Sequence, residues 1–140
     1  MAKTKNFLQS ADLGLLFLRI GVGGLMLMHG IAKLTNGIDG IKTMTVNAGL
    51  PEFYAYGVYV GEVLAPIMVL LGVGTRIGAL LIAFTMINAI WLVGIHQVWT
   101  LTSTGGPEAE LALLFLAGSL ALVFTGSGKY GILKGRGWTD

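Results

Sequence analysis

The chain has 140 residues, of which 54% are hydrophobic and only 11% are charged. A soluble domain normally has about a quarter of its residues charged, so this composition leaves too little polar surface for one. The nine Lys and Arg residues are scattered singly rather than gathered in a patch, which argues against a nucleic-acid partner. The absence of Cys excludes a disulfide framework, a thiolate metal site and a cysteine nucleophile. The composition therefore predicts a membrane protein whose main partner is the lipid bilayer.

Four apolar segments follow one another along the chain. Each approaches the roughly 20 residues that a helix needs to cross a bilayer, and none alternates in the way of a barrel strand. Because backbone groups in lipid must be paired internally, helices are expected. The sequence predicts an all-α integral membrane protein, an antiparallel four-helix transmembrane bundle in a single domain 1–140. Its spans are expected at about residues 13–34, 54–73, 77–95 and 107–125.

The connections carry residues that end or begin helices. After Asn36 and Gly37 comes the longest connection, up to Pro51, in which a short interfacial helix is expected. The second and third segments are joined only by residues 72–75, which is too short for anything but an antiparallel hairpin. Pro107 stands where the fourth helix is expected to begin, since proline needs no amide donor there.

Lys and Arg are distributed unevenly between the two sides of this predicted bundle. The side opposite the termini has only Lys33 and Lys42. Since positive charge accumulates on the cytoplasmic side of membrane proteins, both termini are predicted to be cytoplasmic. The positively charged residues on the side of the termini are Lys3, Lys5, Arg76, Lys129, Lys134 and Arg136.

Several polar residues fall at membrane depth, where ionisable groups are functional candidates by default. With a rise of about 1.5 Å per residue, Arg19 lies about 9 Å from the cytoplasmic end of its helix and Glu62 about 16 Å from the same side, so their side chains could meet. Asn88 falls at about 16 Å as well. His29 and Glu110, both at about 23 to 24 Å, form a second polar layer toward the outside.

Each of these residues has a structural interpretation beside the functional one. Arg19 and Glu62 can form an ion pair that fixes helix order, or Glu62 can be a carboxylate that binds protons or a ligand. Glu110 suits the first turn of a helix, and His29 is either a hydrogen-bonded core histidine or a partner for a quinone carbonyl. Glycines four residues apart, at 57 and 61 and at 74 and 78, favour close packing within the chain or against a partner subunit.

Several short motifs follow one another along the chain: Leu18-Arg19 before a Gly-rich stretch, His29-Gly30-x-x-Lys33-Leu34, Ala48-Gly49-Leu50-Pro51, Glu62 before Leu70-Leu71-Gly72-Val73-Gly74-Thr75-Arg76, and Glu110 before Gly126-x-Gly128. In their order and spacing these motifs resemble those of the DoxX family of small four-helix bacterial membrane proteins over about residues 12–131. Where family members often end in a Ser-Leu-Asp-like tail, this chain has Gly131, Ile132, Leu133 and Lys134, so the resemblance assigns no role to a terminal Asp.

The family is named for a subunit of a thiosulfate:quinone oxidoreductase, and similar proteins are linked to membrane redox complexes and oxidative-stress responses. The resemblance implies a membrane subunit of a quinone-linked oxidoreductase or redox-stress complex in the bacterial inner membrane. Electron transfer would need a bound cofactor or a partner, because the chain has no motif for flavin, nicotinamide or metal. The residues expected to shape a polar pocket for a quinone head group or protons are Arg19, His29, Glu62, Asn88 and Glu110.

Two other functions fit the same residues. In the first, the protein is a non-catalytic scaffold or assembly factor, whose glycine-lined helix faces hold a protein partner or a second copy of the chain. In the second, it is a small carrier whose intramembrane charges bind a polar solute or protons.

Overall fold

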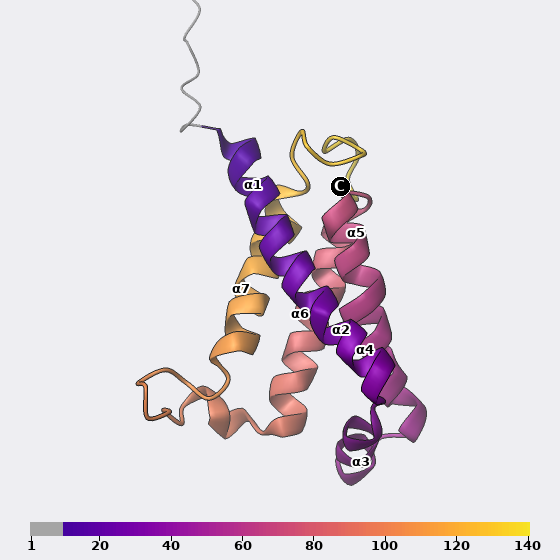
Figure 1. Ribbon diagram of the computed structural model, residues 1–140, viewed down its shortest axis with the longest axis vertical. Helices are drawn as coiled ribbons and strands as arrows, with labels where there is room; N and C mark the ends of the chain where they lie inside the picture. Colours follow the sequence, from indigo (N-terminus) through magenta and orange to yellow (C-terminus); the bar gives the residue numbers. More distant parts are fainter. Residues whose placement is uncertain (1–9) are drawn as a thin grey trace, which may run out of the picture.

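The structure, a computed structural model, describes residues 10–140, in which the regular elements are all helical. The long helices pack side by side along the long axis of the molecule, as Figure 1 shows. Lys3 and Lys5, which the topology prediction counts, lie outside the described residues. An isolated bridge between Leu101 and Pro107 is not part of any sheet.

The first two apolar segments each contain a π-helical turn. Ser10 caps the first segment, because its hydroxyl accepts a hydrogen bond from the Leu13 amide. The first segment runs continuously over Ala11–Asn36 as α1 (Ala11–Arg19), the π-helical turn Ile20–Gly24 and α2 (Leu25–Asn36). The second runs over Glu52–Leu71 as the 3-10 turn Glu52–Tyr56, α4 (Gly57–Tyr59), the π-helical turn Val60–Leu64 and α5 (Ala65–Leu71).

The predicted hairpin between the second and third segments is confirmed. The third segment is α6 (Thr75–Val93), and only residues 72–74 separate it from α5. Gly72 and Gly74 have φ values of 67° and 61°, a left-handed conformation that favours glycine. These two glycines let the chain reverse within three residues.

The fourth segment, α7 (Glu110–Thr125), is shorter than the other three and packs mainly along α6. It begins later than the expected position 107, because the preceding residues belong to a turn. In that turn the Glu108 amide donates to the Thr100 carbonyl and the Ala109 amide to the Gln97 carbonyl. Three helical segments are thus long and apolar enough to cross a membrane, and α7 is a fourth apolar helix of 16 residues. The protein is a multi-pass membrane protein.

A small core lies between the helices, and much of the outer surface is apolar. Leu114 and Phe124, for example, are exposed, as expected of side chains that face lipid. The short helix expected after Asn36 is present as α3 (Asp39–Asn47), which packs against the turn before α4. The buried core consists of Val22, Met26, Ala65, Val69, Ala79, Ile82, Met86, Phe115 and Leu122.

Close packing depends on some of the glycines and not on others. A Cβ at Gly61 would overlap the Thr85 side chain, and a Cβ at Gly30 would overlap the backbone carbonyl of Glu62. Gly57, by contrast, has open space around it. Gly30 therefore allows α2 to lie directly against the π-helical turn Val60–Leu64, and this contact positions the site described next.

Candidate functional site

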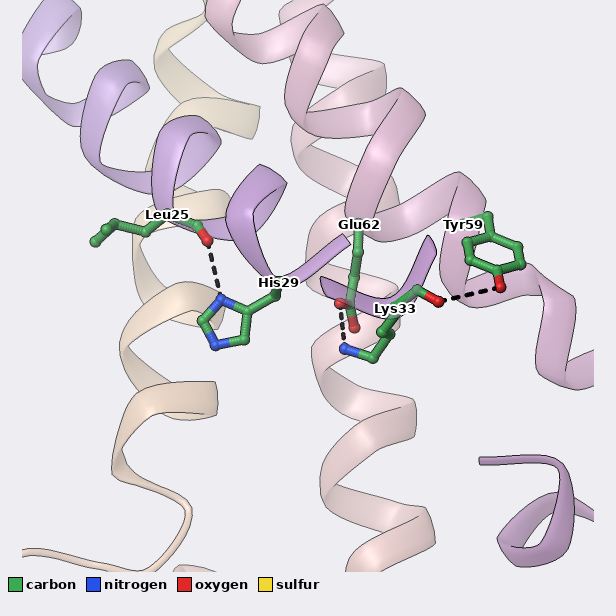
Figure 2. A network of polar contacts seen from close by, with 5 residues as sticks. All are labelled: Leu25, His29, Lys33, Tyr59 and Glu62. Carbon is green, nitrogen blue, oxygen red and sulfur yellow. Dashed lines mark hydrogen bonds and ion pairs between the residues drawn. The ribbon is translucent and has the colours of Figure 1, made fainter. Parts of the chain in front are cut away.

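An ion pair between Lys33 and Glu62 joins α2 to the second helical segment (Figure 2). The Glu62 side chain is only 7% exposed and that of Lys33 is 25% exposed. Gly30 lies one turn before Lys33, so its contact with the Glu62 backbone brings the ammonium and the carboxylate together. Glu62 itself sits in a π-helical turn, an irregularity that is frequent at functional sites.

Sequence reasoning counted Lys33 only as a charge at the end of a helix and missed this role. The signal was present in His29-Gly30-x-x-Lys33, because residues three apart share a helix face. A glycine permits the neighbouring helix to come close, and a lysine one turn later lies on the same face. Such a pair indicates a charged contact with the neighbouring helix.

Arg19, expected within reach of Glu62, has different partners. It is buried, and its guanidinium donates to the carbonyls of Val69 at 2.8 Å, Leu70 at 2.6 Å and Ser127 at 3.2 Å. The carbonyls in the last turn of a helix have no partner within the helix, and α5 ends at Leu71. Arg19 therefore closes the end of α5 and does not reach Glu62.

The larger cavity, cavity 1, has a volume of about 540 Å³ and lies between α3, the turn before α4, α4 and α6. The Tyr54 hydroxyl donates to Asn88 Oδ1 at 2.8 Å, and Asn88 Nδ2 donates to the Phe84 carbonyl at 2.8 Å. Glu62 and Asn88 were expected at the same depth in the membrane, and both line cavity 1. Its polar lining consists of Lys33, Thr45, Tyr54, Glu62, Thr85 and Asn88, and the remaining lining residues are apolar or Gly.

Only some of these polar groups are free to bind a ligand. The hydroxyls of Thr45 and Thr85 donate to the carbonyls of Ile41 and Leu81 in their own helices. Lys33 Nζ has three N–H donors and Asn88 Nδ2 has two, so each keeps donor capacity beyond its recorded bond. Cavity 1 therefore offers two donors and the Glu62 carboxylate along otherwise apolar walls.

The smaller cavity, cavity 2, has a volume of about 270 Å³ and lies between α2, α6 and α7. His29 Nδ1 donates to the Leu25 carbonyl at 2.9 Å, as Figure 2 shows, which leaves Nε2 free. The His29 ring also meets the Phe115 ring edge-on, with 5.8 Å between the centroids, so this contact bridges α2 and α7. The polar residues that line cavity 2 are His29, Lys33, Glu62, Gln97 and Glu108.

Glu110 lines neither cavity. It is the first residue of α7, it is exposed, and its carboxyl group lies over Gly106. Glu108, two residues earlier in the turn, lines cavity 2 together with His29. The structure thus brings Glu62 together with Asn88 and with His29, and it places Arg19 and Glu110 elsewhere.

The tail after α7 folds back over the end of the bundle and buries Asp140, to which sequence reasoning gave no role. The Asp140 carboxylate accepts hydrogen bonds from Thr75 Oγ1 at 2.8 Å, Ser127 Oγ at 2.6 Å and the Gly135 amide at 2.8 Å. Burial alone would raise the pKa of Asp140, but these hydrogen bonds outweigh it and lower the pKa below its usual value. The bonds also form across three separated stretches of chain, which a sequence pattern does not reveal.

With this geometry in hand, comparisons with known proteins place the chain in a family. The family model named DoxX matches residues 14–95, which is more than half of the chain. The chain belongs to the DoxX family. "Putative oxidoreductase CatD" of Bacillus subtilis (strain 168) is 33% identical over 119 residues, which cover 85% of this chain and 84% of that protein. No solved structure matches the chain.

The DoxX match divides the polar residues into two groups. All residues that line cavity 1, from Lys33 to Val93, lie within the matched range, and so does Arg19. Gln97 and Glu108 of cavity 2, and Asp140 of the tail, lie beyond it. Cavity 1 is therefore built entirely from the part of the chain that matches the DoxX family.

Proposed function

We propose that this DoxX-family protein is a membrane subunit of a quinone-linked oxidoreductase or redox-stress complex, and that cavity 1 holds a quinone head group. The observation that carries the proposal is cavity 1 itself, a space of about 540 Å³ with apolar walls and a short polar edge. Small-molecule sites typically have volumes of about 300 to 1,000 Å³, mostly apolar linings and a few placed polar groups.

The free polar groups of cavity 1 suit both redox forms of a quinone. The unused N–H groups of Lys33 and Asn88 can donate to the carbonyl oxygens of the oxidised ring. The Glu62 carboxylate, only 7% exposed, can accept a hydrogen bond from a hydroxyl of the reduced ring. Phe53, Phe84 and other apolar lining residues provide contact area for the ring and its hydrocarbon tail.

The chain needs help to transfer electrons. The relative in Bacillus subtilis is named as an oxidoreductase, yet the polar groups of cavity 1 can bind and exchange protons but carry no electrons. Electron transfer requires a redox cofactor, which we assign to a protein partner in the same membrane complex. A homo-oligomer of this chain is the other assembly that purification of the native complex would reveal.

We further propose that α7 is a fourth membrane span and that both termini face the cytoplasm of the bacterial inner membrane. A helix of 16 residues is about 24 Å long, somewhat less than the roughly 30 Å of a bilayer core. Asp12 and Lys129 form an ion pair, so the beginning of α1 and the end of α7 lie on one side. Arg76 lies on that side because it donates to the Val123 carbonyl near the end of α7. Lys134 and Arg136 lie there too, in the tail that bonds back to Gly72, as the positive-inside rule expects.

The natural absence of Cys makes this topology easy to test. Single Thr102→Cys and Lys134→Cys variants would be treated in intact cells with a maleimide that crosses only the outer membrane. We expect labelling of the cysteine at 102 in intact cells and of the cysteine at 134 only after the inner membrane is permeabilised. Equal labelling of both in intact cells would contradict the proposed four-span topology.

The quinone proposal is tested with a photoreactive azidoquinone and the purified full chain. Val58 lines cavity 1, whereas Val60 on the same segment is 43% exposed to the surroundings of the bundle. We expect the label on peptides that contain residues 53–58 or 84–93, and a decrease of about tenfold in Val58→Trp, with no decrease in the matched control Val60→Trp. Labelling spread over the lipid-facing surface, or insensitive to Val58→Trp, would refute a head-group site in cavity 1.

The same experiment separates this function from a scaffold role. A scaffold would keep its partner in Val58→Trp and would show no specific azidoquinone labelling. The native complex would also be isolated in mild detergent. We would abandon the redox proposal if that complex contained no reducible quinone and if Glu62→Gln left quinone-dependent respiration unchanged.

A further inference from the structure

We propose that the Lys33–Glu62 pair is a proton-exchange site between the two cavities, through which a proton taken from a ligand hydroxyl in cavity 1 leaves by way of cavity 2. The proposal rests on the proposed function for the source of the proton, and on the structure alone for the route.

The first observation is the position of the ion pair. Lys33 and Glu62 line both cavities. Ala89 and Val93 also line both, but they are apolar. Within residues 10–140, the ion pair is therefore the polar connection between cavity 1 and cavity 2.

The second observation is the contrast between the two cavities. In cavity 1, the nearest other titratable group is Tyr54, whose hydroxyl proton is used in the bond to Asn88. In cavity 2, the lining also includes His29 from α2 and Gln97 and Glu108 from the connection between α6 and α7, and both His29 and Glu108 are exposed. A volume of about 270 Å³ has room for several waters of about 30 Å³ each among these polar partners.

The titratable groups around the ion pair support release of the proton toward cavity 2. On α2 the neighbour is His29, and on α4 it is Tyr59, whose hydroxyl donates to the Lys33 carbonyl at 3.5 Å. The α6 lining of both cavities contributes no titratable side chain. The turn before α7 contributes Glu108. Among the residues that line cavity 2, His29 and Glu108 are the two that are both titratable and exposed.

The third observation is a ring contact between two residues that line cavity 2. The edge-on contact between His29 and Phe115 bridges α2 and α7. The volume of cavity 2 leaves room for water next to the ion pair, and this ring contact borders that space.

The proton balance follows from these contacts. When a ligand hydroxyl in cavity 1 gives its proton to the Glu62 carboxylate, the ligand O–H bond breaks, its electron pair stays on the ligand oxygen and a carboxyl O–H forms. The pair then carries a net charge of +1 and has lost the attraction between its two charges. Release of one proton to His29 Nε2 or to water in cavity 2 restores the carboxylate and the ion pair. The electrons leave separately, to the redox partner that the proposed function requires.

The route is tested by time-resolved infrared spectroscopy of the full chain after a drop in pH, following the protonated carboxyl band that Glu62→Gln removes. Ala112→Trp fills cavity 2, Val58→Trp fills cavity 1, and the matched control Ala121→Trp is exposed on α7 and lines neither. We expect Ala112→Trp to slow proton uptake by Glu62 by about tenfold or more, and the other two variants to change it by less than about twofold.

Several results would overturn the route. The first is proton uptake in Ala112→Trp that is as fast as in the unmodified chain. The second is uptake that is slowed in Val58→Trp alone, and the third is a Glu62 carboxylate that never takes up a proton in the folded protein. If Ala112→Trp fails to fold, the smaller change Ala112→Leu gives the same comparison with a smaller slowing. Azidoquinone labelling is measured separately: its failure rejects the quinone site alone, and unaffected uptake with normal labelling rejects the proton route alone.

Discussion

The two ends of the bundle bury polar side chains in different ways. At the end where the tail folds back, called here the tail end, Arg19, Thr75, Ser127 and Asp140 are bonded to one another or to backbone carbonyls, and Arg19 and Asp140 line neither cavity. Toward the α3 end, Lys33, Glu62 and Asn88 line a cavity and keep capacity for further hydrogen bonds. Figure 1 shows these two ends at the top and the bottom of the molecule.

The difference separates polar groups that are satisfied within the protein from polar groups that keep unused donors or acceptors. A buried group whose donors and acceptors are used within the protein stabilises one conformation. A buried group that faces a cavity with unused donors or acceptors is available to a ligand. By this criterion the tail end holds the bundle together, and the polar groups of the α3 end are the ones that we propose to bind a ligand, although both ends contain buried charges.

The largest expected effect is the loss of Arg19. In Arg19→Met, the carbonyls of Leu70 and Ser127 lose their guanidinium donor and that of Val69 keeps only the Gly72 amide, so we expect the free energy of unfolding to fall by at least about 3 kcal/mol. Thermal unfolding in detergent, followed by circular dichroism, measures the change. Arg19→Lys should recover little of it, because an ammonium cannot reproduce the planar fork of donors. Full recovery with Lys would mean that charge alone, and not the capping of α5, is what Arg19 supplies.

The next effect concerns the contact that forms the site. In Gly30→Ala, the new Cβ would overlap the Glu62 carbonyl, so α2 must shift away from the second segment, at a cost of about 1 to 3 kcal/mol. The shift should also weaken the Lys33–Glu62 pair and lower azidoquinone labelling. Gly24→Ala is the matched control on the same segment, because nothing lies within 4 Å of its Cβ position. If the two variants behave alike, the close approach at Gly30 does not position the site.

Asp140 gives a pH-dependent effect at the tail end. Its folded-state pKa is lowered below the ordinary 3.8, so its contribution to stability is complete above the unfolded pKa and is lost as the pH falls through the folded value. Unfolding measured from neutral to acidic pH should therefore show a loss of stability below about pH 4 that Asp140→Asn largely removes. At neutral pH, Asp140→Asn should cost about 1 to 2 kcal/mol, because Thr75 and Ser127 donate to different carboxylate oxygens and an amide has only one oxygen to accept them. An unchanged acid transition in Asp140→Asn would show that other groups cause it.

The sequence predicted the helices well and the contacts between them less well. The hairpin at residues 72–75 and the helix after Asn36 were predicted from breaker residues and length, which are local properties. The expected contact between Arg19 and Glu62 joined residues at about 9 Å and 16 Å from one side, and Arg19 instead bonds to carbonyls at the end of α5. The π-helical turn Ile20–Gly24 follows Arg19 and changes the faces of the residues of α2, among them Lys33. The partners of Lys33 and Asp140 depend on how closely Gly30 packs and on where the tail folds, and neither follows from periodicity.

The smallest expected effect on stability is at the α3 end, in Glu62→Gln. Lys33 loses its partner, but its side chain is 25% exposed and lines cavity 2, where the ammonium can be hydrated, so we expect a loss of less than about 1 kcal/mol. Azidoquinone labelling should nevertheless fall by about tenfold, since the ligand loses a charged acceptor and Lys33 loses its orientation. The double variant Lys33→Met with Glu62→Gln should be about as stable as the unmodified chain while its labelling stays low. If Glu62→Gln instead destabilises the protein as much as Arg19→Met, the ion pair is a structural element like those of the tail end, and the distinction between the two ends fails.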